Sequence, residues 1–113
     1  PITTMATGTA SSLAVRVIHG ARPGPAVFVS AAIHGDEIIG TAVIQRLAQE
    51  LRPETLTGTV LLVPVANIFG FITHSRYLPD RRDLNRSFPG SAGGSLAGQL
   101  AHVFYREVVG RCV

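Results

Sequence analysis

The sequence predicts an α/β fold in which a mostly parallel, mixed sheet carries helices on its faces. Two continuous apolar runs, residues 26–33 (AVFVSAAI) and 59–66 (TVLLVPVA), have the pattern of strands that are buried on both faces. Between them, apolar residues recur every four positions, as in an amphipathic helix. This strand–helix–strand order implies a parallel crossover with the helix packed on the sheet.

The elements before and between these strands follow from local patterns. Residues 12–19 alternate small or apolar with polar side chains and predict a strand, whereas the Gly- and Pro-rich residues 20–25 predict a turn. The helix has Arg46 and Glu50 on its polar side and ends before Pro53. Its expected buried face is a row of four apolar residues: Ile39, Val43, Leu47 and Leu51.

Residues 67–90 have no convincing periodicity and predict a long loop, and loops of this length inside compact domains are usually functional. Helical spacing returns over residues 95–109, with Gly110 as the expected cap. Cys112–Val113 is expected to begin a further strand. Because ligands bind beyond the carboxyl ends of parallel strands, the segments that follow the two apolar runs are expected to meet in space.

Composition excludes several classes of protein. Hydrophobic residues make up 46% of the chain and charged residues 15%, a balance typical of a packed core rather than of disorder. No apolar run approaches the roughly 20 residues of a membrane span. No signal peptide is visible, so we expect no membrane contact and a cytoplasmic location. The single cysteine, Cys112, leaves no internal disulfide and agrees with a reducing compartment.

All basic residues are arginines, the formal net charge is +3, and four arginines gather in the long loop: Arg76, Arg81, Arg82 and Arg86. A nucleic-acid surface would cluster its basic residues on one face with aromatic residues among them, a pattern that this sequence lacks. Arginines within one loop suit the fixed, planar recognition of a carboxylate or phosphate. We therefore expect a small anionic ligand and no nucleic acid.

The first candidate for chemistry is His34-Gly35-Asp36-Glu37, between a buried strand and a helix. A histidine and a glutamate at this spacing can turn an imidazole nitrogen and a carboxylate to one point, and zinc accepts both ligands. Gly35 allows a tight turn between them. The alternative is structural: Asp36 and Glu37 only cap the helix, and His34 is a satisfied loop histidine. By themselves these residues favour the structural alternative, because short motifs recur by chance.

The second candidate is Ser75-Arg76-Tyr77 together with residues 83–90 (DLNRSFPG). An Asn-Arg pair offers an amide and a guanidinium fork that suit a substrate carboxylate. A separate arginine nearby could stabilise the oxyanion that forms when water attacks a carbonyl. The alternative is a solvated loop in which Asp83 pairs with a near neighbour in sequence: Arg81, Arg82 or Arg86.

Together the motifs HGDE, SRY and DLNRSFPG resemble the succinylglutamate desuccinylase/aspartoacylase family, which is related to the zinc carboxypeptidases. The resemblance runs from about residue 26 to the last helix, and DLNRSFPG is its most specific part. It implies that His34 and Glu37 are two ligands of a single zinc ion. It also implies that Arg76 polarises the scissile carbonyl and that the substrate carboxylate is bound by Asn85 and Arg86.

The resemblance implies hydrolysis of the amide bond of an N-acyl amino acid, or of a similar small carboxylate, by a zinc-activated water. The family's third zinc ligand and its general-base glutamate have no counterpart before Val113. We therefore expect residues 1–113 to be the N-terminal portion of the catalytic domain and to be inactive alone. A carboxypeptidase-type peptidase remains an alternative, as does a non-catalytic module that binds an anion. Substrate identity and self-association into a homo-oligomer stay open.

Overall fold

The computed structural model describes residues 1–112 and has a three-stranded sheet at its centre. The strands are β3 (Arg16–His19), β4 (Arg22–Ser30) and β5 (Thr57–Val63). β5 is the central strand, with β4 parallel to it on one side and β3 antiparallel to it on the other. The predicted α/β class with a mixed sheet is confirmed.

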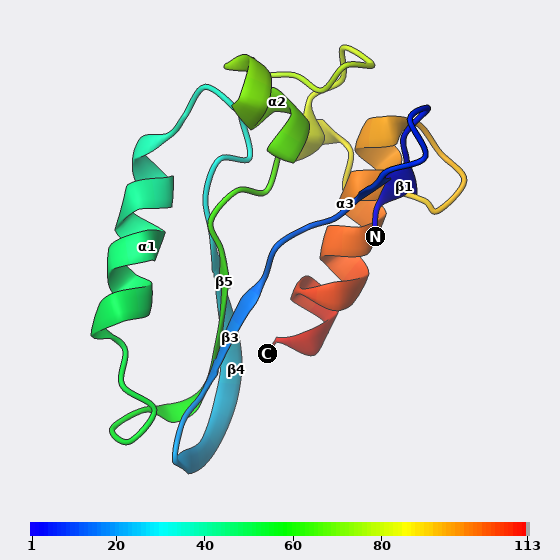
Figure 1. Ribbon diagram of the computed structural model, residues 1–113. Helices are drawn as coiled ribbons and strands as arrows, with labels where there is room; N and C mark the ends of the chain where they lie inside the picture. The colour runs from blue at the N-terminus through cyan, green and yellow to red at the C-terminus, as the bar shows by residue number, and fades with distance from the viewer. Residues whose placement is uncertain (113) are drawn as a thin grey trace.

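Helices lie on both sides of this sheet, as Figure 1 shows. α1 (Ile39–Glu50) follows β4 and covers one face, and α3 (Leu96–Glu107) lies on the other. α2 (Ile68–Thr73) follows β5 and lies beyond the end of the sheet. The remaining elements are small: strands β1 (Thr3–Thr4) and β2 (Ala10–Ser11), and the 3-10 helices η1 (Leu84–Arg86) and η2 (Val109–Arg111). No helix within residues 1–112 is both long and apolar enough to cross a membrane.

The core has two parts because β5 buries side chains on both of its faces. Val60 and Leu62 pack with Ile44 of α1 in one cluster. Leu61 and Val63 belong to the other cluster, which includes the buried face of α3. This alternation is the two-residue period of a strand. The burial predicted for this strand is confirmed, although the strand begins at residue 57 and ends at residue 63.

β4 differs from the prediction in its bounds and in its burial. It begins at Arg22, so it includes residues predicted as a turn, and it ends at Ser30. Val27, Phe28 and Val29 are 44%, 36% and 38% exposed, so the prediction of burial on both faces is wrong. The reason is the position of the strand, because in residues 1–112 β4 pairs with β5 along one edge only.

α1 turns only part of the predicted face to the core. Ile39 and Val43 were expected on the buried face, but they are 81% and 59% exposed. Ile44 is buried instead, beside the partly buried Leu47 and Leu51. With 3.6 residues per turn, a step of four residues overshoots a full turn by about 40°. A strict four-residue repeat therefore drifts around the helix and off the core face.

The other predicted elements shift or divide. The strand predicted over residues 12–19 narrows to β3, and residues 67–90 contain α2 and η1 rather than loop alone. α3 begins after its cap, Ser95, whereas the expected cap Gly110 lies inside η2. The strand start expected at Cys112–Val113 lies partly outside the described residues.

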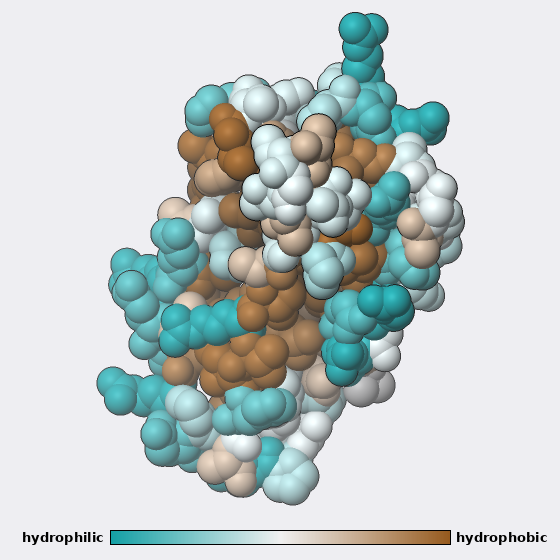
Figure 2. Space-filling model, turned by 45° about the vertical axis from the view of Figure 1, so that its right-hand side comes forward, coloured by the Kyte–Doolittle hydropathy of each residue, from teal (hydrophilic) through white to brown (hydrophobic). Residues whose placement is uncertain are grey.

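Apolar surface remains uncovered on the α3 side of the sheet. Figure 2 shows apolar side chains gathered across the middle of one face of the molecule, with polar side chains around them. A hollow of about 510 Å³ opens on this side of the sheet, away from the predicted site residues. It is lined by residues in or beside the strands, at the end of α3 and in η2: Val15, Val17, His19, Ala26, Thr59, Leu61, Glu107 and Arg111.

The exposed edge of β4 predicts self-association of this chain. An unpaired strand edge with apolar side chains is a template for pairing with another strand, and a lysine on such an edge blocks it. We expect Val27→Lys to shift the chain towards monomer in sedimentation velocity. The matched control is Ile72→Lys, which adds the same charge at an apolar position of α2 that is 76% exposed. Equal effects of the two variants would refute the role of the edge.

Candidate active site

The predicted site lies where β4 and β5 end. The segments that follow these strands remain side by side, because the N–H groups of Ala66 and Asn67 donate to the carbonyls of Ala31 and Ala32 at 2.8 and 2.9 Å. The segment that contains His34 therefore lies next to the start of α2 (Figure 1). The predicted meeting of the two segments is confirmed.

His34 and Glu37 face each other directly. Nδ1 of His34 lies 3.0 Å from Oε1 of Glu37, and the two side chains are 9% and 61% exposed. A turn brings them together, since the N–H of Glu37 donates to the carbonyl of His34 at 3.1 Å. The three-residue spacing thus produces the convergence that the sequence predicts.

Gly35 is required by a close approach of two backbones. A Cβ atom on Gly35 would lie 1.9 Å from the carbonyl carbon of Gly70 and 2.3 Å from the backbone nitrogen of Phe71. Only a residue without a side chain leaves room for this contact. Gly35 therefore does more than allow a turn, because it lets α2 pack directly on the His34 segment.

Asp83, which the sequence did not mark as a site residue, joins the two halves of the site. Its Oδ1 lies 3.1 Å from Nε2 of His34. Its Oδ2 accepts hydrogen bonds from Nη2 and Nε of Arg76 at 3.0 and 3.2 Å. The Asp83 side chain is only 15% exposed. The sequence feature that could have identified Asp83 is its position as the first residue, and the one acidic residue, of the eight-residue motif DLNRSFPG.

The carboxyl group of Asp83 is held in its ionised form. Burial alone would raise the pKa of Asp83, but the N–H of Asn85, the Arg76 guanidinium and the His34 ring together hold that pKa below its usual value. An ionised carboxylate accepts hydrogen bonds and cannot donate them, so Nε2 of His34 carries the proton in this contact.

A neutral imidazole then has no proton left for its other nitrogen. Nδ1 of His34 nevertheless faces a second carboxylate, that of Glu37. With both groups in these forms two electron-pair acceptors face each other, and a proton or a metal ion between them would make the contact favourable. An imidazole nitrogen beside a carboxylate oxygen is a donor set that zinc accepts. His34 and Glu37 thus have the chemistry of two metal ligands.

Within residues 1–112, no group of three or more His, Cys, Asp or Glu side chains is arranged to hold a metal ion. The geometry of His34 explains why Asp83 cannot join His34 and Glu37 as a third ligand of one ion. The two ring nitrogens point in different directions, so Glu37 and Asp83 meet different sides of the ring and cannot share one ion. His34 and Glu37 therefore form a pair that could hold a metal ion together with further ligands.

Asn85 enters the site through its backbone, whose N–H donates to Oδ1 of Asp83 at 2.9 Å. The side chains of Asn85 and Arg86 are exposed. Neither makes a hydrogen bond to His34 or Glu37 within the described part of the chain. Asn85 therefore contacts the site through its backbone, and Arg86 follows it in η1. Of the four arginines of the loop, only Arg76 is partly buried.

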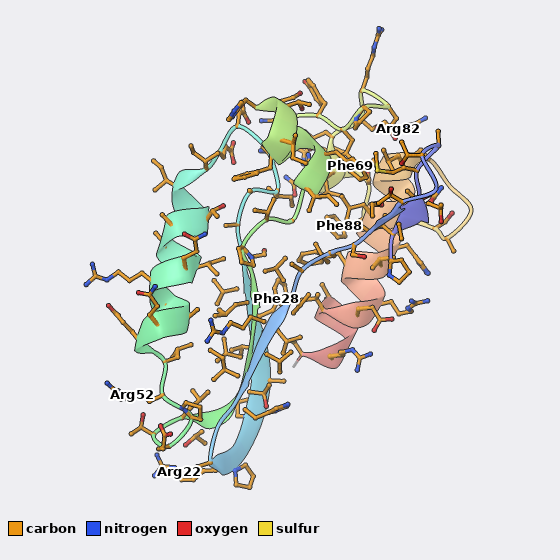
Figure 3. The ribbon with its side chains drawn as sticks, in the orientation of Figure 1. Arg22, Phe28, Arg52, Phe69, Arg82 and Phe88 are labelled. Carbon is orange, nitrogen blue, oxygen red and sulfur yellow. The ribbon has the colours of Figure 1, made fainter. Side chains whose placement is uncertain are left out.

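The other arginines of the loop do not pair with Asp83, so the alternative of such a pairing is wrong. Arg82 lies 4.0 Å from a different carboxylate, that of Asp80. Arg86 donates to the carbonyl of the preceding residue, and Arg81 is exposed. Figure 3 shows Arg82 at the outer side of the loop. Of the four loop arginines, Arg76 is therefore the one whose side chain bonds to Asp83.

Contacts with α3 anchor the loop that carries Asp83. Asp80 accepts a hydrogen bond from the N–H of Ala97 at 3.0 Å. Phe88 packs edge-on against Phe104, with ring centroids 5.7 Å apart. Figure 3 shows Phe88 directed towards α3, so both sides of η1 are held in place.

Comparison with known proteins gives the family. A model of the succinylglutamate desuccinylase/aspartoacylase catalytic domain matches residues 23–112. The chain is 38% identical over 87 residues to N-alpha-acetyl-L-2,4-diaminobutyric acid deacetylase from Halomonas elongata, over 76% of this chain and 25% of that protein.

Two solved structures share the fold. The succinylglutamate desuccinylase/aspartoacylase from Rhodobacter sphaeroides is 30% identical, with a TM-score of 0.88 over 97% of this chain and 35% of that one. The product-bound ectoine utilization protein EutE from Ruegeria pomeroyi is 35% identical, with a TM-score of 0.79 over 87% of this chain and 30% of that one. The chain thus spans between a quarter and about a third of these relatives. Because the family model matches most of its length, the chain belongs to the succinylglutamate desuccinylase/aspartoacylase family.

Proposed function

We propose that this chain supplies part of the catalytic centre of a zinc-dependent deacylase. The reaction is hydrolysis of the amide bond of an N-acyl amino acid or a similar small carboxylate. The observation that carries the proposal is the arrangement of His34, whose two ring nitrogens face the carboxylates of Glu37 and Asp83. Membership of a family of deacylases supports amide hydrolysis as the reaction class.

His34 and Glu37 are the proposed zinc ligands. The ligating atoms are 3.0 Å apart, so one ion can contact both at typical zinc distances of about 2.0–2.2 Å. When bound, zinc supplies a Lewis acid that polarises a carbonyl and lowers the pKa of a water molecule. Asp83 fixes the proton of His34 on Nε2 and leaves Nδ1 for the metal, as carboxylates beside zinc-binding histidines commonly do.

Arg76 is the proposed stabiliser of the oxyanion. Asp83 engages Nε and Nη2 of its guanidinium, and the side chain is still 41% exposed. Its remaining N–H groups are therefore free to donate to a substrate oxygen, where fixed donors stabilise the charge that develops during reaction. The exposed side chains of Asn85 and Arg86 are proposed to hold the substrate carboxylate through an amide and a guanidinium fork.

The full activity is proposed for a catalytic domain that joins this chain to the rest of the fold, since the chain spans 35% of the Rhodobacter structure. We assign the third zinc ligand and the general base to the rest of that domain. A small N-acylated carboxylate is the proposed substrate class, and the Halomonas relative, named as a deacetylase of an N-acetylated amino acid, supports it. A cytoplasmic location stays a prediction.

A chimera tests this function. Residues 23–112 would replace the matched segment of the Rhodobacter sphaeroides protein, and the product would be assayed on a panel of N-acyl amino acids with metal analysis. We expect turnover that a chelator removes and added zinc restores. His34→Ala should abolish both turnover and zinc content.

Asp36→Asn is the matched control, because Asp36 is an exposed carboxylate in the same segment. It should leave zinc content and turnover within about twofold of the parent, as surface substitutions usually do. Retention of zinc by the His34→Ala chimera would refute the ligand assignment. Carboxylate binding without zinc or turnover would favour the non-catalytic module, and release of a C-terminal amino acid from peptides alone would favour the peptidase.

A further inference from the structure

We infer that Asn67 is a positioning residue that holds Arg76 at a fixed place relative to His34. The inference rests on the proposed function of Arg76. Asn67 belongs to none of the three motifs, yet its side chain is completely buried at the end of the β5 segment. A buried amide is costly unless it is hydrogen-bonded, so its partners are informative.

The hydrogen bonds of Asn67 reach both halves of the site. Its backbone N–H donates to the carbonyl of Ala32, two residues before His34, at 2.9 Å. Its side-chain Nδ2 donates to the carbonyl of Arg76 at 3.4 Å. One buried residue therefore connects the segment of the proposed zinc ligand to the backbone of the proposed oxyanion stabiliser.

The turn between Asn67 and Arg76 is closed tightly. Oδ1 of Asn67 accepts the N–H of Gly70 at 2.9 Å, and the carbonyl of Gly70 accepts the N–H of Ser75 at 2.9 Å. A Cβ atom on Gly70 would lie 2.6 Å from Nδ2 of Asn67 and 2.6 Å from the carbonyl oxygen of Ser75. These contacts leave no room for a Cβ atom on Gly70, and a shift of the Arg76 carbonyl would lengthen its hydrogen bond to Asn67.

Helix capping alone does not account for an asparagine here. The other capping side chains of this chain are Ser95 at α3 and Asp83 at η1, and each accepts a backbone N–H. A serine or an aspartate would cap α2 equally well. An aspartate has no proton to donate at neutral pH, and a serine must accept and donate through one oxygen that lies closer to the backbone. The amide of Asn67 uses two separate atoms, with Oδ1 accepting the N–H of Gly70 and Nδ2 donating to the carbonyl of Arg76. The bond donated to Arg76 therefore accounts for an asparagine at this position.

The test uses nuclear magnetic resonance on the 113-residue chain, without metal or substrate. Asn67→Asp keeps an acceptor for the helix cap and has no donor for Arg76, and Asn67→Ser keeps an acceptor but has no atom at the position of the donor Nδ2. We expect the Nε–H group of Arg76, which is bonded to Asp83, to exchange with water faster by up to about tenfold, the change that corresponds to one lost hydrogen bond. Its signal should move towards that of the exposed Arg81.

Ser95→Ala is the matched control, because it removes a cap from α3 and touches no group of the turn. It should leave the Arg76 signal and its exchange rate unchanged. An unchanged Arg76 signal in folded Asn67→Ser would overturn the inference and leave Asn67 as a cap. This result is independent of zinc or turnover, so it is distinct from failure of the proposed function.

A second measurement covers variants that do not fold. In the wild-type chain, the Nδ2 protons of buried Asn67 should exchange more slowly than those of the exposed amide of Asn85. Equal exchange rates of the two amides would contradict the hydrogen bond to Arg76.

Discussion

Replacement of Arg76 by alanine is expected to lower kcat by on the order of 10²-fold in the chimeric catalytic domain, the usual cost of losing one oxyanion donor. The guanidinium carries two roles, since it donates to Asp83 and has N–H groups left for a substrate oxygen. KM should change less than kcat, because the contact to the carbonyl strengthens only as negative charge develops. Steady-state kinetics on an N-acetyl amino acid measures both constants.

Arg82→Ala is the matched control for Arg76→Ala. It removes the same side chain from the same loop, but Arg82 is 64% exposed and its nearest carboxylate, Asp80, lies 4.0 Å away. We expect kcat within about twofold of the parent. Arg76→Lys should remain impaired, because a lysine keeps the charge but cannot donate through two nitrogens of a planar fork. Equal losses in Arg82→Ala and Arg76→Ala would show that the assignment is wrong.

Asp83→Asn is expected to weaken zinc binding by about 10–100-fold, the range found when the outer partner of a metal-binding histidine is removed. The substitution keeps the size of the side chain and removes its charge. An amide has a single oxygen, so it cannot accept from both His34 and Arg76 as the carboxylate does. The proton on Nε2 of His34 then loses its anionic partner. The tautomer that leaves Nδ1 unprotonated is less favoured, so Nδ1 binds the metal less tightly. Competition of the chimera with a chromophoric chelator measures the affinity.

The control for Asp83 is Asp80→Asn, in the same loop. Asp80 accepts backbone N–H groups from Arg82 and Ala97 and touches neither His34 nor Arg76 in the described residues. Its replacement should lower the stability of the loop and leave zinc affinity near the parent value. If Asp83→Asn bound zinc as tightly as the parent, the contact with His34 would be structural only, and the proposed tautomer would have no role in metal binding.

Local pattern predicted burial correctly where the place of the strand in the sheet agreed with it. β5 was predicted as a strand buried on both faces because its apolar residues are continuous, and its central place in the sheet agrees. β4 has the same pattern, but within residues 1–112 it pairs with β5 alone, and its apolar side chains stay exposed. An apolar run shows that its residues favour a buried strand. Whether they are buried depends on the strands and helices that pack beside them.

In two helices, the periodicity of apolar residues did not predict the structure. The apolar row of α1 was read at intervals of four, and the drift of that row placed Ile39 and Val43 outside the core. α2 has six residues, fewer than two turns, so no repeat exists to be detected. Its presence depends on Asn67, which caps it, and on Gly35, which leaves space for it.

The family motifs, the mixed α/β class and the convergence of His34 with Glu37 can be predicted from the residues alone, because residues three apart across one turn are placed by local geometry. The partner of the second nitrogen of His34 depends instead on tertiary packing. Asp83 is 49 positions away, and it arrives there because β4 and β5 end at the same edge of the sheet and α3 anchors the loop that follows. Contact between residues so distant in sequence depends on the summed packing of all the elements between them, which no local pattern of residues encodes.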